Sequence, residues 1–266
     1  MKPSVSEKEA AFLSFRDVCL RYHTPEKEIE ALDRVSFSAE RGEFLVLLGP
    51  SGCGKTTILS LIAGLIAPSS GEILWNGSTG EKERPRIGYM FQHDALFPWL
   101  TLWDNALLCP RIRKGKDREK EAEADTLLEE YGLAPFKKSF PRELSGGMRQ
   151  RAALIRTLAA DPDLLLLDEP FSALDYQTRV LVSGDIAGLI RRTGKTCVMV
   201  THDVAEAISL GDRILILSKR PSSVRLSLPV DIPARDALSR RSSPRFGELF
   251  RIIWKEMNDD EPPDSL

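Results

Sequence analysis

The stretch FLVLLGPSGCGKTT, residues 44–57, decides the fold of this 266-residue chain. Its first five residues are continuously apolar, as expected for a strand that a parallel sheet buries on both faces. The glycine-rich turn that follows runs into an apolar helical pattern at residues 58–62, and the whole fits G-x-x-x-x-G-K-[ST] between a strand and a helix. Glycines at positions 49, 52 and 54 allow successive backbone N–H groups to turn inward beside a helix N-terminus. The stretch therefore predicts a phosphate-binding loop.

Side chains within this loop have separate expected roles. Lys55 places a point charge near β- and γ-phosphates, and the Thr56 hydroxyl is placed to ligate Mg²⁺. Thr57 adds a further donor. The alternative is a glycine-rich turn without a ligand, which the strand-to-helix context disfavours. The residues predicted to hold the phosphates are Gly49, Pro50, Ser51, Gly52, Cys53, Gly54, Lys55, Thr56 and Thr57.

A second apolar run, LLLLDE at residues 164–169, ends in two carboxylates. Open parallel sheets place their ligand sites at the carboxyl ends of strands, so Asp168 and Glu169 are expected beside the phosphate loop. Asp168 suits the coordination shell of Mg²⁺, whereas Glu169 can reach the γ-phosphate and polarise a water molecule for in-line attack. Taken alone, such a pair could equally be a solvated turn, so this prediction depends on the phosphate loop.

Residues 145–147, Ser-Gly-Gly, form a second candidate anion site 23 residues before Asp168. They open a helical pattern and offer backbone donors without a strand of their own. Two such sites imply two contacts on one nucleotide, or two nucleotides. The loop and the acidic pair alone could belong to a GTPase, a kinase, a helicase or a transport ATPase. With Ser-Gly-Gly added, the chain resembles the ATP-binding cassette (ABC) family from about Phe15 to Leu217.

The resemblance implies roles for residues outside these motifs. Tyr22 would stack on adenine, although its place also suits an ordinary strand residue. Gln92 would contact Mg²⁺ or the attacking water and would hinge a helical subdomain. His202 would contact the γ-phosphate, and the Ser-Ala-Leu-Asp loop at residues 172–175 would reach across a dimer interface.

The resemblance also implies an assembly. In this family Ser145, Gly146 and Gly147 act on ATP held by the other subunit, so two cassettes close head to tail around two nucleotides, with Mg²⁺ as cofactor. Met148 stands where the common signature has glutamine, which leaves the donors intact and points to a subgroup. The implied catalytic residues are Glu169, His202 and Gln92, and the implied metal ligands are Thr56, Gln92 and Asp168.

Strand-like runs separated by helical patterns predict an α/β fold. As an ABC-like chain it is expected to have a P-loop NTPase (RecA-like) core with a mainly parallel sheet, an N-terminal antiparallel β region and a helical insertion subdomain. The expected strands lie near residues 12–20, 32–39, 44–48, 86–91, 164–167, 196–200 and 213–217.

The expected domain organisation has three parts. An ATP-binding domain spans residues 12–218, with the helical subdomain inserted at about 93–160. A C-terminal extension with one helix spans 219–257, and a disordered acidic tail spans 258–266. The extension carries an amphipathic pattern at residues 245–257, which fits packing on the body or contact with a partner equally well.

Composition excludes several classes of protein. With 42% hydrophobic and 29% charged residues, the chain is not disordered, collagenous or coiled coil as a whole. Its 37 Lys+Arg against 39 Asp+Glu leave no global basic field for nucleic acid or an anionic membrane. The longest apolar stretch, residues 58–67, is about half of the roughly 20 residues that a spanning helix needs. The four scattered cysteines and the absence of a signal-peptide pattern predict free thiols in the cytosol.

The segment HDALFPWLTLWDN, residues 93–105, is aromatic where a loop is usually polar. It is expected to be either a packed loop with Trp99 buried or a docking groove for a short helix of a membrane subunit. Its Pro-Trp-Leu-Thr, together with SGGMRQ at residues 145–150 and Lys-Arg-Pro at 219–221, resembles importer cassettes for nitrate, aliphatic sulfonates, taurine and related small solutes such as pyrimidine precursors.

This second resemblance implies partners. The chain would drive uptake of a small solute through an integral membrane permease at the cytoplasmic face of the cell membrane, with a periplasmic or lipoprotein solute-binding protein acting indirectly. No nucleic acid is expected. A second copy of the same chain is the expected dimer partner, although the sequence leaves open the solute and whether the dimer is homo- or heteromeric. The alternative is an ABC protein without a membrane partner, acting in DNA repair, translation or iron–sulfur assembly. Coiled-coil arms, zinc-type cysteine spacings or a second cassette would favour it, and this sequence has none.

Overall fold

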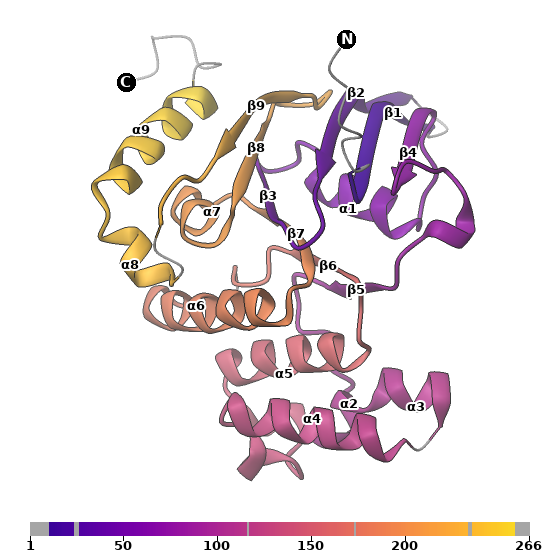
Figure 1. Cartoon of the computed structure of the whole chain (residues 1–266), viewed down its shortest axis with the longest axis vertical. Helices are drawn as coiled ribbons and strands as arrows, with labels where there is room; N and C mark the ends of the chain where they lie inside the picture. Colours follow the sequence, from indigo (N-terminus) through magenta and orange to yellow (C-terminus); the bar gives the residue numbers. More distant parts are fainter. Residues whose placement is uncertain (1–10, 24–26, 116, 173, 234–235, 259–266) are drawn as a thin grey trace, which may run out of the picture.

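The computed structural model describes residues 11–23, 27–115, 117–172, 174–233 and 236–258 (Figure 1). Within these ranges, strands form two sheets. The strands are β1 (Leu13–His23), β2 (Glu28–Ala39), β3 (Phe44–Leu48), β4 (Ser70–Trp75), β5 (Ile87–Met90), β6 (Leu164–Asp168), β7 (Thr196–Thr201), β8 (Arg213–Leu217) and β9 (Val224–Pro229).

The larger sheet has six strands in the order β5-β6-β7-β3-β8-β9. All neighbours in it are parallel except β8 and β9, which are antiparallel. The smaller sheet, in the order β2-β1-β4, is antiparallel throughout. The predicted fold class, a mainly parallel sheet with an antiparallel β region near the N-terminus, is confirmed.

Helices cover the larger sheet, and those from α2 to α5 form a lobe at one end of the molecule (Figure 1). Single turns of 3-10 helix occur at Glu81–Glu83, Ala134–Phe136 and Pro141–Glu143. The α-helices are α1 (Lys55–Ala63), α2 (Leu102–Ala106), α3 (Leu108–Lys114), α4 (Arg118–Glu130), α5 (Gly146–Ala159), α6 (Tyr176–Thr193), α7 (Val204–Leu210), α8 (Ala237–Arg241) and α9 (Pro244–Asn258).

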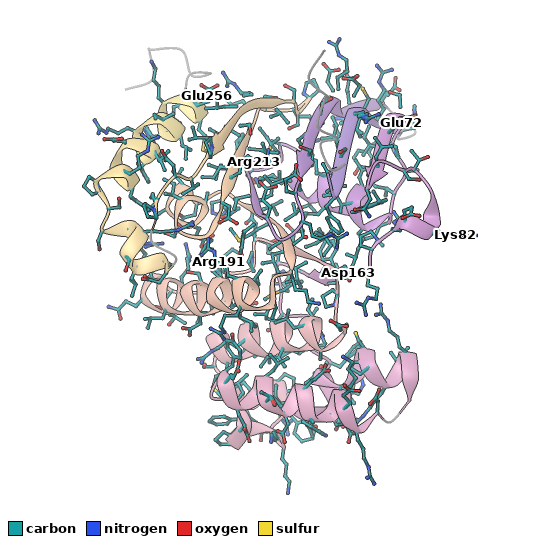
Figure 2. The ribbon with its side chains drawn as sticks, in the orientation of Figure 1. Glu72, Lys82, Asp163, Arg191, Arg213 and Glu256 are labelled. Atoms are coloured by element: carbon teal, nitrogen blue, oxygen red, sulfur yellow. The ribbon has the colours of Figure 1, made fainter. Side chains whose placement is uncertain are left out.

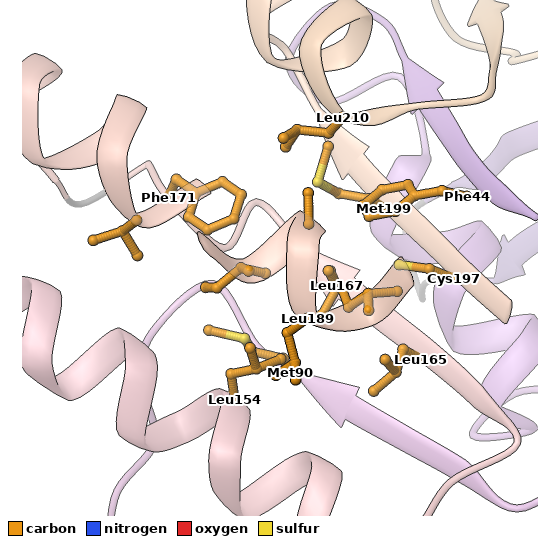
Figure 3. Packing of buried hydrophobic residues seen from close by; sticks show 14 of the residues in the cluster. Phe44, Met90, Leu154, Leu165, Leu167, Phe171, Leu189, Cys197, Met199 and Leu210 are labelled. Carbon is orange, nitrogen blue, oxygen red and sulfur yellow. The ribbon is translucent and has the colours of Figure 1, made fainter. Parts of the chain in front are cut away.

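The apolar run of β3 divides the core into two layers, because successive side chains of a strand point to opposite faces of the sheet. Leu45 and Leu47 pack in the layer that contains α1 and the smaller sheet. Phe44, Val46 and Leu48 pack in the layer that contains α5, α6 and α7 (Figure 3). All five side chains are at most 2% exposed, and each such burial is worth about 1.5–3 kcal/mol. The carboxyl end of β3 is therefore held from both sides.

The structure adds two strands to the predicted set. β4 has only two buried residues, Leu74 and Trp75, and it forms by pairing with β1. β9 alternates half-buried and exposed residues and pairs with β8. The larger sheet therefore continues past residue 218, where the sequence places the end of the ATP-binding domain.

The C-terminal extension also contains two helices, α8 and α9, where the sequence predicts one. Leu249 and Ile253 of α9 are fully buried in the same layer as β6 and β7, so this helix packs on the body of the protein. Of the predicted acidic tail, only Asn258 belongs to the described residues, and it ends α9.

Charged side chains lie mostly on the outside of the molecule (Figure 2). Glu72 and Lys82 are exposed examples. Arg213 of β8 instead pairs with Glu43, the residue before β3, with 2.7 Å between Nε and Oε1. Among the described helices, none has the length and apolar character needed to span a membrane.

Candidate functional site

The predicted phosphate loop connects β3 to α1, and its glycines adopt conformations that other residues rarely do. Gly52 and Gly54 have φ angles of 74° and 108°, in the left-handed region that favours glycine. A Cβ on Gly49 would lie 2.9 Å from Cys53 Sγ and 3.2 Å from Leu217 Cβ, so no side chain fits there. The loop thus presents its backbone at the N-terminus of α1, as anion binding requires.

Lys55 folds back over the loop. Its side chain is 5% exposed, and its Nζ donates to the carbonyl oxygens of Gly49 at 2.8 Å and Pro50 at 2.9 Å. The same ammonium lies 4.0 Å from Glu169 Oε1. The buried cation therefore stands between the loop and the acidic pair, where phosphate oxygens would be attracted to it.

The acidic pair lies next to the loop, as predicted. Thr56 donates from its hydroxyl to Asp168 Oδ1 at 3.1 Å, and the Tyr89 hydroxyl donates to Asp168 Oδ2 at 3.2 Å. Burial raises the pKa of the Asp168 carboxyl, and the charge of Glu169 adds to this shift, while the two hydroxyl groups oppose it. Burial and the charge of Asp168 raise the pKa of Tyr89 as well. A cation at this position would stabilise the ionised carboxylate.

Glu169 and His202 come together from neighbouring strands. Glu169 follows β6 and His202 follows β7, and the two strands run parallel, so both residues reach the same edge of the sheet. His202 Nδ1 lies 3.1 Å from Glu169 Oε2. Glu169 has a φ of 45°, an uncommon conformation that directs its side chain into the site region. A cavity of about 280 Å³ beside the loop is lined by Ser51, Gly52, Gly54, Lys55, Thr56, Thr57, Gln92, Glu169 and Arg220.

Other predicted residues lie at the margin of this cavity. Tyr22 is 40% exposed on β1, and its hydroxyl is 3.4 Å from Thr57 Oγ1. Gly49, Pro50 and Cys53 form the base of the loop and do not line the cavity. Burial raises the pKa of the Cys53 thiol.

Two residues of this region are missing from the sequence prediction. Tyr89 contacts Asp168. The sequence feature that could have indicated this contact is the position of Tyr89 in β5, the strand that ends shortly before Gln92. Arg220 lines the cavity and donates from Nη2 to the Gly52 carbonyl oxygen at 2.9 Å. The sequence analysis notes Arg220 only as part of the Lys-Arg-Pro turn at residues 219–221. That turn indicates a branch of the family and does not predict a place in the site.

The second candidate anion site is separate from the phosphate loop. Ser145 is the N-cap of α5, and its Oγ accepts a hydrogen bond from the Met148 backbone N–H at 3.3 Å. A Cβ on Gly147 would lie 2.9 Å from Thr178 Cγ2, which explains the glycine by close packing against α6. Residues 145–147 do not line the phosphate-loop cavity. Within one chain, therefore, the two candidate anion sites do not share a pocket.

Comparison with known proteins decides between the kinds of nucleotide-binding protein. The model of a family described as ABC transporter matches residues 32–172, more than half of the chain. The chain belongs to the ABC transporter family. The ABC cassette fold and the predicted activity, ATP hydrolysis coupled to transport, are confirmed.

Relatives of this cassette match over most of its length. It is 45% identical over 250 residues to the uncharacterized ABC transporter ATP-binding protein YtlC of Bacillus subtilis (strain 168), which covers 93% of this chain and 96% of that protein. It is 39% identical over 254 residues to the taurine import ATP-binding protein TauB of Roseobacter denitrificans (strain ATCC 33942 / OCh 114), with 91% and 94% covered. These relatives are transport proteins by name, so the non-transport alternative gains no support.

Solved structures also resemble this cassette, and two of them are informative. The dimeric post-hydrolysis state of the ATP-binding cassette MJ0796, bound to ADP and Pi, has a TM-score of 0.70 at 31% identity and covers 83% of this chain and 99% of that chain. CbiO1 of Clostridium perfringens, part of the ABC transporter complex cbiONQ, has a TM-score of 0.74 at 23% identity, with 96% and 97% covered. The second likeness shows the fold alone.

The donor groups of the cassette fit Mg²⁺ bound together with a nucleotide. Thr56 offers a hydroxyl, Asp168 a carboxylate and Gln92 a side-chain amide, all oxygen donors of the kind that Mg²⁺ prefers. Among the described residues, no cluster of three or more His, Cys, Asp or Glu side chains could hold a metal ion by itself. Mg²⁺ usually takes one or two protein ligands and completes its shell with phosphates and water, which agrees with this sparse set.

Proposed function

We propose that this cassette is the energy-coupling subunit of an importer for a small solute of the taurine, sulfonate or nitrate class. Two cassettes would close head to tail at the cytoplasmic face of the cell membrane, bound to a permease that receives the solute from a separate binding protein. The import names of relatives such as TauB, matched over more than nine-tenths of both chains, support uptake as the direction. Selection of the solute would belong to the permease and the binding protein.

The observation that supports the proposed head-to-tail dimer is the separation of the two candidate anion sites within one chain. The phosphate loop precedes α1 whereas residues 145–147 begin α5, and these three residues do not line the cavity beside the loop. A second copy in head-to-tail orientation would bring residues 145–147 of one subunit onto the nucleotide of the other. ATP then contacts both subunits only in the closed state and favours closure, while hydrolysis removes the γ-phosphate contact.

The chemistry follows from the groups around the loop. The backbone N–H groups and Lys55 bind the phosphates, and Glu169 is placed to accept a proton from the attacking water. His202, in contact with Glu169, would orient the γ-phosphate. When bound with the nucleotide, Mg²⁺ neutralises charge on the β- and γ-phosphates, and Thr56, Asp168 and Gln92 would hold it.

Tyr22 is proposed to stack on the adenine ring. Tyr22 is 40% exposed, and its hydroxyl lies 3.4 Å from Thr57 Oγ1, beside the phosphate loop. Removing the ring in Tyr22→Ala is expected to raise the Kd for ATP about tenfold, because stacking on a base is worth about 1–3 kcal/mol. Isothermal titration calorimetry checks this, with Tyr22→Trp expected to keep the affinity. Equal Kd values for wild type and Tyr22→Ala would contradict the stacking role.

The surface proposed to dock the permease is the exposed aromatic pair Phe97 and Trp99. Trp99 is 69% exposed, so the packed alternative with Trp99 buried is wrong. The centroids of the two rings lie 5.1 Å apart. The buried Asn105 holds their loop, because its side-chain amide donates to the carbonyl oxygens of Phe97, Leu100 and Thr101. A rigid loop that presents aromatic rings to solvent suits a helix-docking site.

Co-purification tests this docking surface and the importer function together. The cassette, expressed with the multi-spanning membrane protein encoded beside it, is expected to purify as a complex. Trp99→Ala is expected to reduce recovery of the complex at least about fivefold while leaving the Kd for ATP unchanged, because an aromatic anchor truncated at an interface costs more than about 1 kcal/mol. Ile112→Ala, at a 75% exposed position of the same lobe, is the control. A wild-type cassette that never associates with the membrane protein would defeat the importer proposal.

A further inference from the structure

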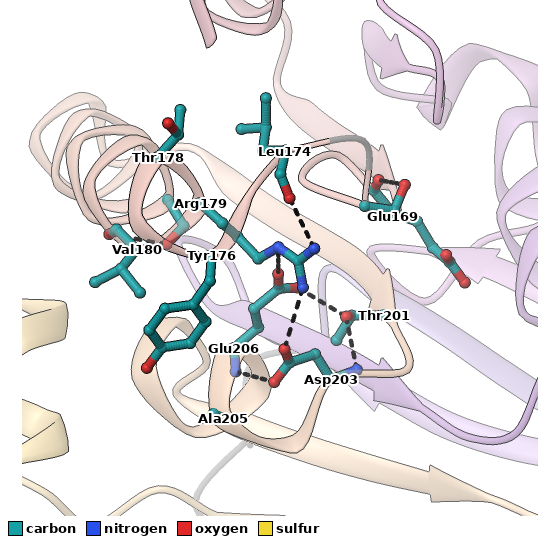
Figure 4. Close-up of polar contacts among 12 residues, drawn as sticks. Glu169, Leu174, Tyr176, Thr178, Arg179, Val180, Thr201, Asp203, Ala205 and Glu206 are labelled. Carbon is teal, nitrogen blue, oxygen red and sulfur yellow. Dashed lines mark hydrogen bonds and ion pairs between the residues drawn. The ribbon is translucent and has the colours of Figure 1, made fainter. Parts of the chain in front are cut away.

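Arg179, in the first turn of α6, joins two loops beside the nucleotide site (Figure 4). Its Nη2 donates to the Leu174 carbonyl oxygen at 2.8 Å, in the loop that precedes α6. Its Nη1 lies 3.6 Å from Asp203 Oδ2, and its Nε lies 3.8 Å from Glu206 Oε1. One guanidinium therefore faces a carbonyl oxygen of the loop before α6 and two carboxylates at the start of α7.

The two carboxylates belong to the segment that carries His202. Thr201 donates from its hydroxyl to Glu206 Oε2 at 2.8 Å, and the Thr201 hydroxyl oxygen in turn accepts from the Asp203 backbone N–H at 3.0 Å. Asp203 caps α7 by accepting from the Glu206 backbone N–H at 3.0 Å. His202 lies between Thr201 and Asp203. The backbone on each side of the histidine is therefore held by the network that Arg179 completes.

Burial makes this network depend on its cation. The Glu206 side chain is 4% exposed, and a buried carboxylate needs a paired charge and hydrogen bonds to stay ionised. Burial raises the pKa of Glu206, and Arg179 opposes that shift. In the described part of the chain, Arg179 Nε is a buried donor without a hydrogen-bond acceptor, and the oxygen it faces is Glu206 Oε1.

The loop before α6 also reaches the segment that acts on the partner's nucleotide in the proposed dimer. A Cβ on Gly146 would lie 3.6 Å from Leu174 Cδ2. In the other direction, Ser172 Oγ donates to the Glu169 carbonyl oxygen at 3.0 Å. Ala173, between them, lies outside the described residues. The Leu174 side chain thus lies close to Gly146, and its carbonyl oxygen accepts from Arg179.

We propose that Arg179 is a positioning residue for ATP hydrolysis, which fastens Leu174, in the loop before α6, to the segment of His202. Movement of that loop against a second cassette would then shift the histidine relative to Glu169. The inference rests on the proposed head-to-tail dimer, because only there does the loop meet a partner. A guanidinium suits this role because its planar fork of N–H groups can donate in several directions at once, whereas an ammonium is a point charge. Arg179 does not line the phosphate-loop cavity, so it acts through the histidine.

Steady-state ATPase assays and ATP titrations on the full chain test the proposal. Arg179→Ala is expected to lower kcat at least tenfold while the Kd for ATP stays within twofold of wild type. Arg179→Lys is expected to have a kcat between those of wild type and Arg179→Ala, because lysine keeps the positive charge but lacks the planar guanidinium group. In a His202→Ala background, Arg179→Ala is expected to lower kcat no further, since the arginine acts through the histidine. A purely structural role would instead lower kcat in both backgrounds by the same factor.

Arg192→Ala is the matched control, because Arg192 lies on the same helix, pairs with Glu130 at 3.6 Å and is outside the network. It is expected to leave kcat and the Kd for ATP unchanged. If Arg179→Ala does not fold, as judged by thermal melting, then Arg179→Lys and Glu206→Gln decide, and wild-type kcat in both overturns the proposal. Unchanged kcat in Arg179→Ala beside an inactive His202→Ala overturns it as well. A fully active His202→Ala would instead remove the histidine from the proposed mechanism.

Discussion

The Glu169→Gln variant is expected to bind ATP with wild-type affinity and to hydrolyse it at least about a hundredfold more slowly, because general base catalysis contributes about 10²–10⁴ in rate. Glutamine keeps the size and the hydrogen-bonding edge of the side chain but cannot accept the proton of the attacking water. His202 Nδ1, 3.1 Å from the carboxylate, would still have an oxygen to face. Release of phosphate under saturating ATP measures kcat directly.

The same variant should also reveal the closed dimer. When ATP is bound and not consumed, both subunits keep their contacts with it, so size-exclusion chromatography with ATP should show Glu169→Gln at twice the mass of the chain. Glu129→Gln, an isosteric change at an exposed position of α4, is the control and should behave like wild type. Undiminished turnover in Glu169→Gln would remove Glu169 from the catalytic role.

Lys55→Ala is expected to weaken ATP binding by about tenfold to a hundredfold and to abolish turnover. The estimate follows from the about 1.5–3 kcal/mol that a hydrogen bond to a charged group contributes. The ammonium is buried between the loop carbonyls and Glu169, so its removal leaves the phosphates without their nearest cation and Glu169 without its counter-charge. Calorimetric titration with ATP gives the change in Kd.

Lys195→Ala provides the comparison for this loss of charge. Lys195 pairs with Asp161 at 2.8 Å and precedes β7, so it lies at the amino end of a strand whose carboxyl end carries His202. Its removal should not change the Kd for ATP. A Lys55→Ala protein that binds ATP within twofold of wild type would show that the backbone of the loop alone carries phosphate affinity.

The sequence predicts those parts of the site in which the functional residues lie within, or directly after, one helix or strand with a clear sequence pattern. The strand, turn and helix at residues 44–63 form one continuous segment, so a local pattern suffices to describe them. The run at residues 164–168 is also described by a local pattern. Its continuous apolar residues suit a central strand, and the strand is fully buried. Asp168 ends this strand and Glu169 follows it directly, so the strand fixes the position of both residues.

The parts that the sequence does not predict depend on contacts between distant segments. β9 carries a weak alternating pattern and becomes a strand only because β8 offers it an edge. Arg220 and Gly52 are 168 residues apart, and Tyr89 and Asp168 are 79 apart, so neither contact leaves a local signal. Arg179 is one of many arginines in the chain until the fold sets it between Leu174 and Glu206.

The position of β3 within its sheet also governs when the nucleotide site can form during synthesis. Of its two neighbours, β7 begins about 150 residues and β8 about 170 residues after it, and Glu43 pairs with Arg213 across 170 positions. The ribosome therefore delivers the phosphate loop long before the strands that hold it in place. At about 5–20 residues per second, the phosphate loop is synthesised several seconds before both of its neighbouring strands, so we expect the site to form only after residue 217 has emerged.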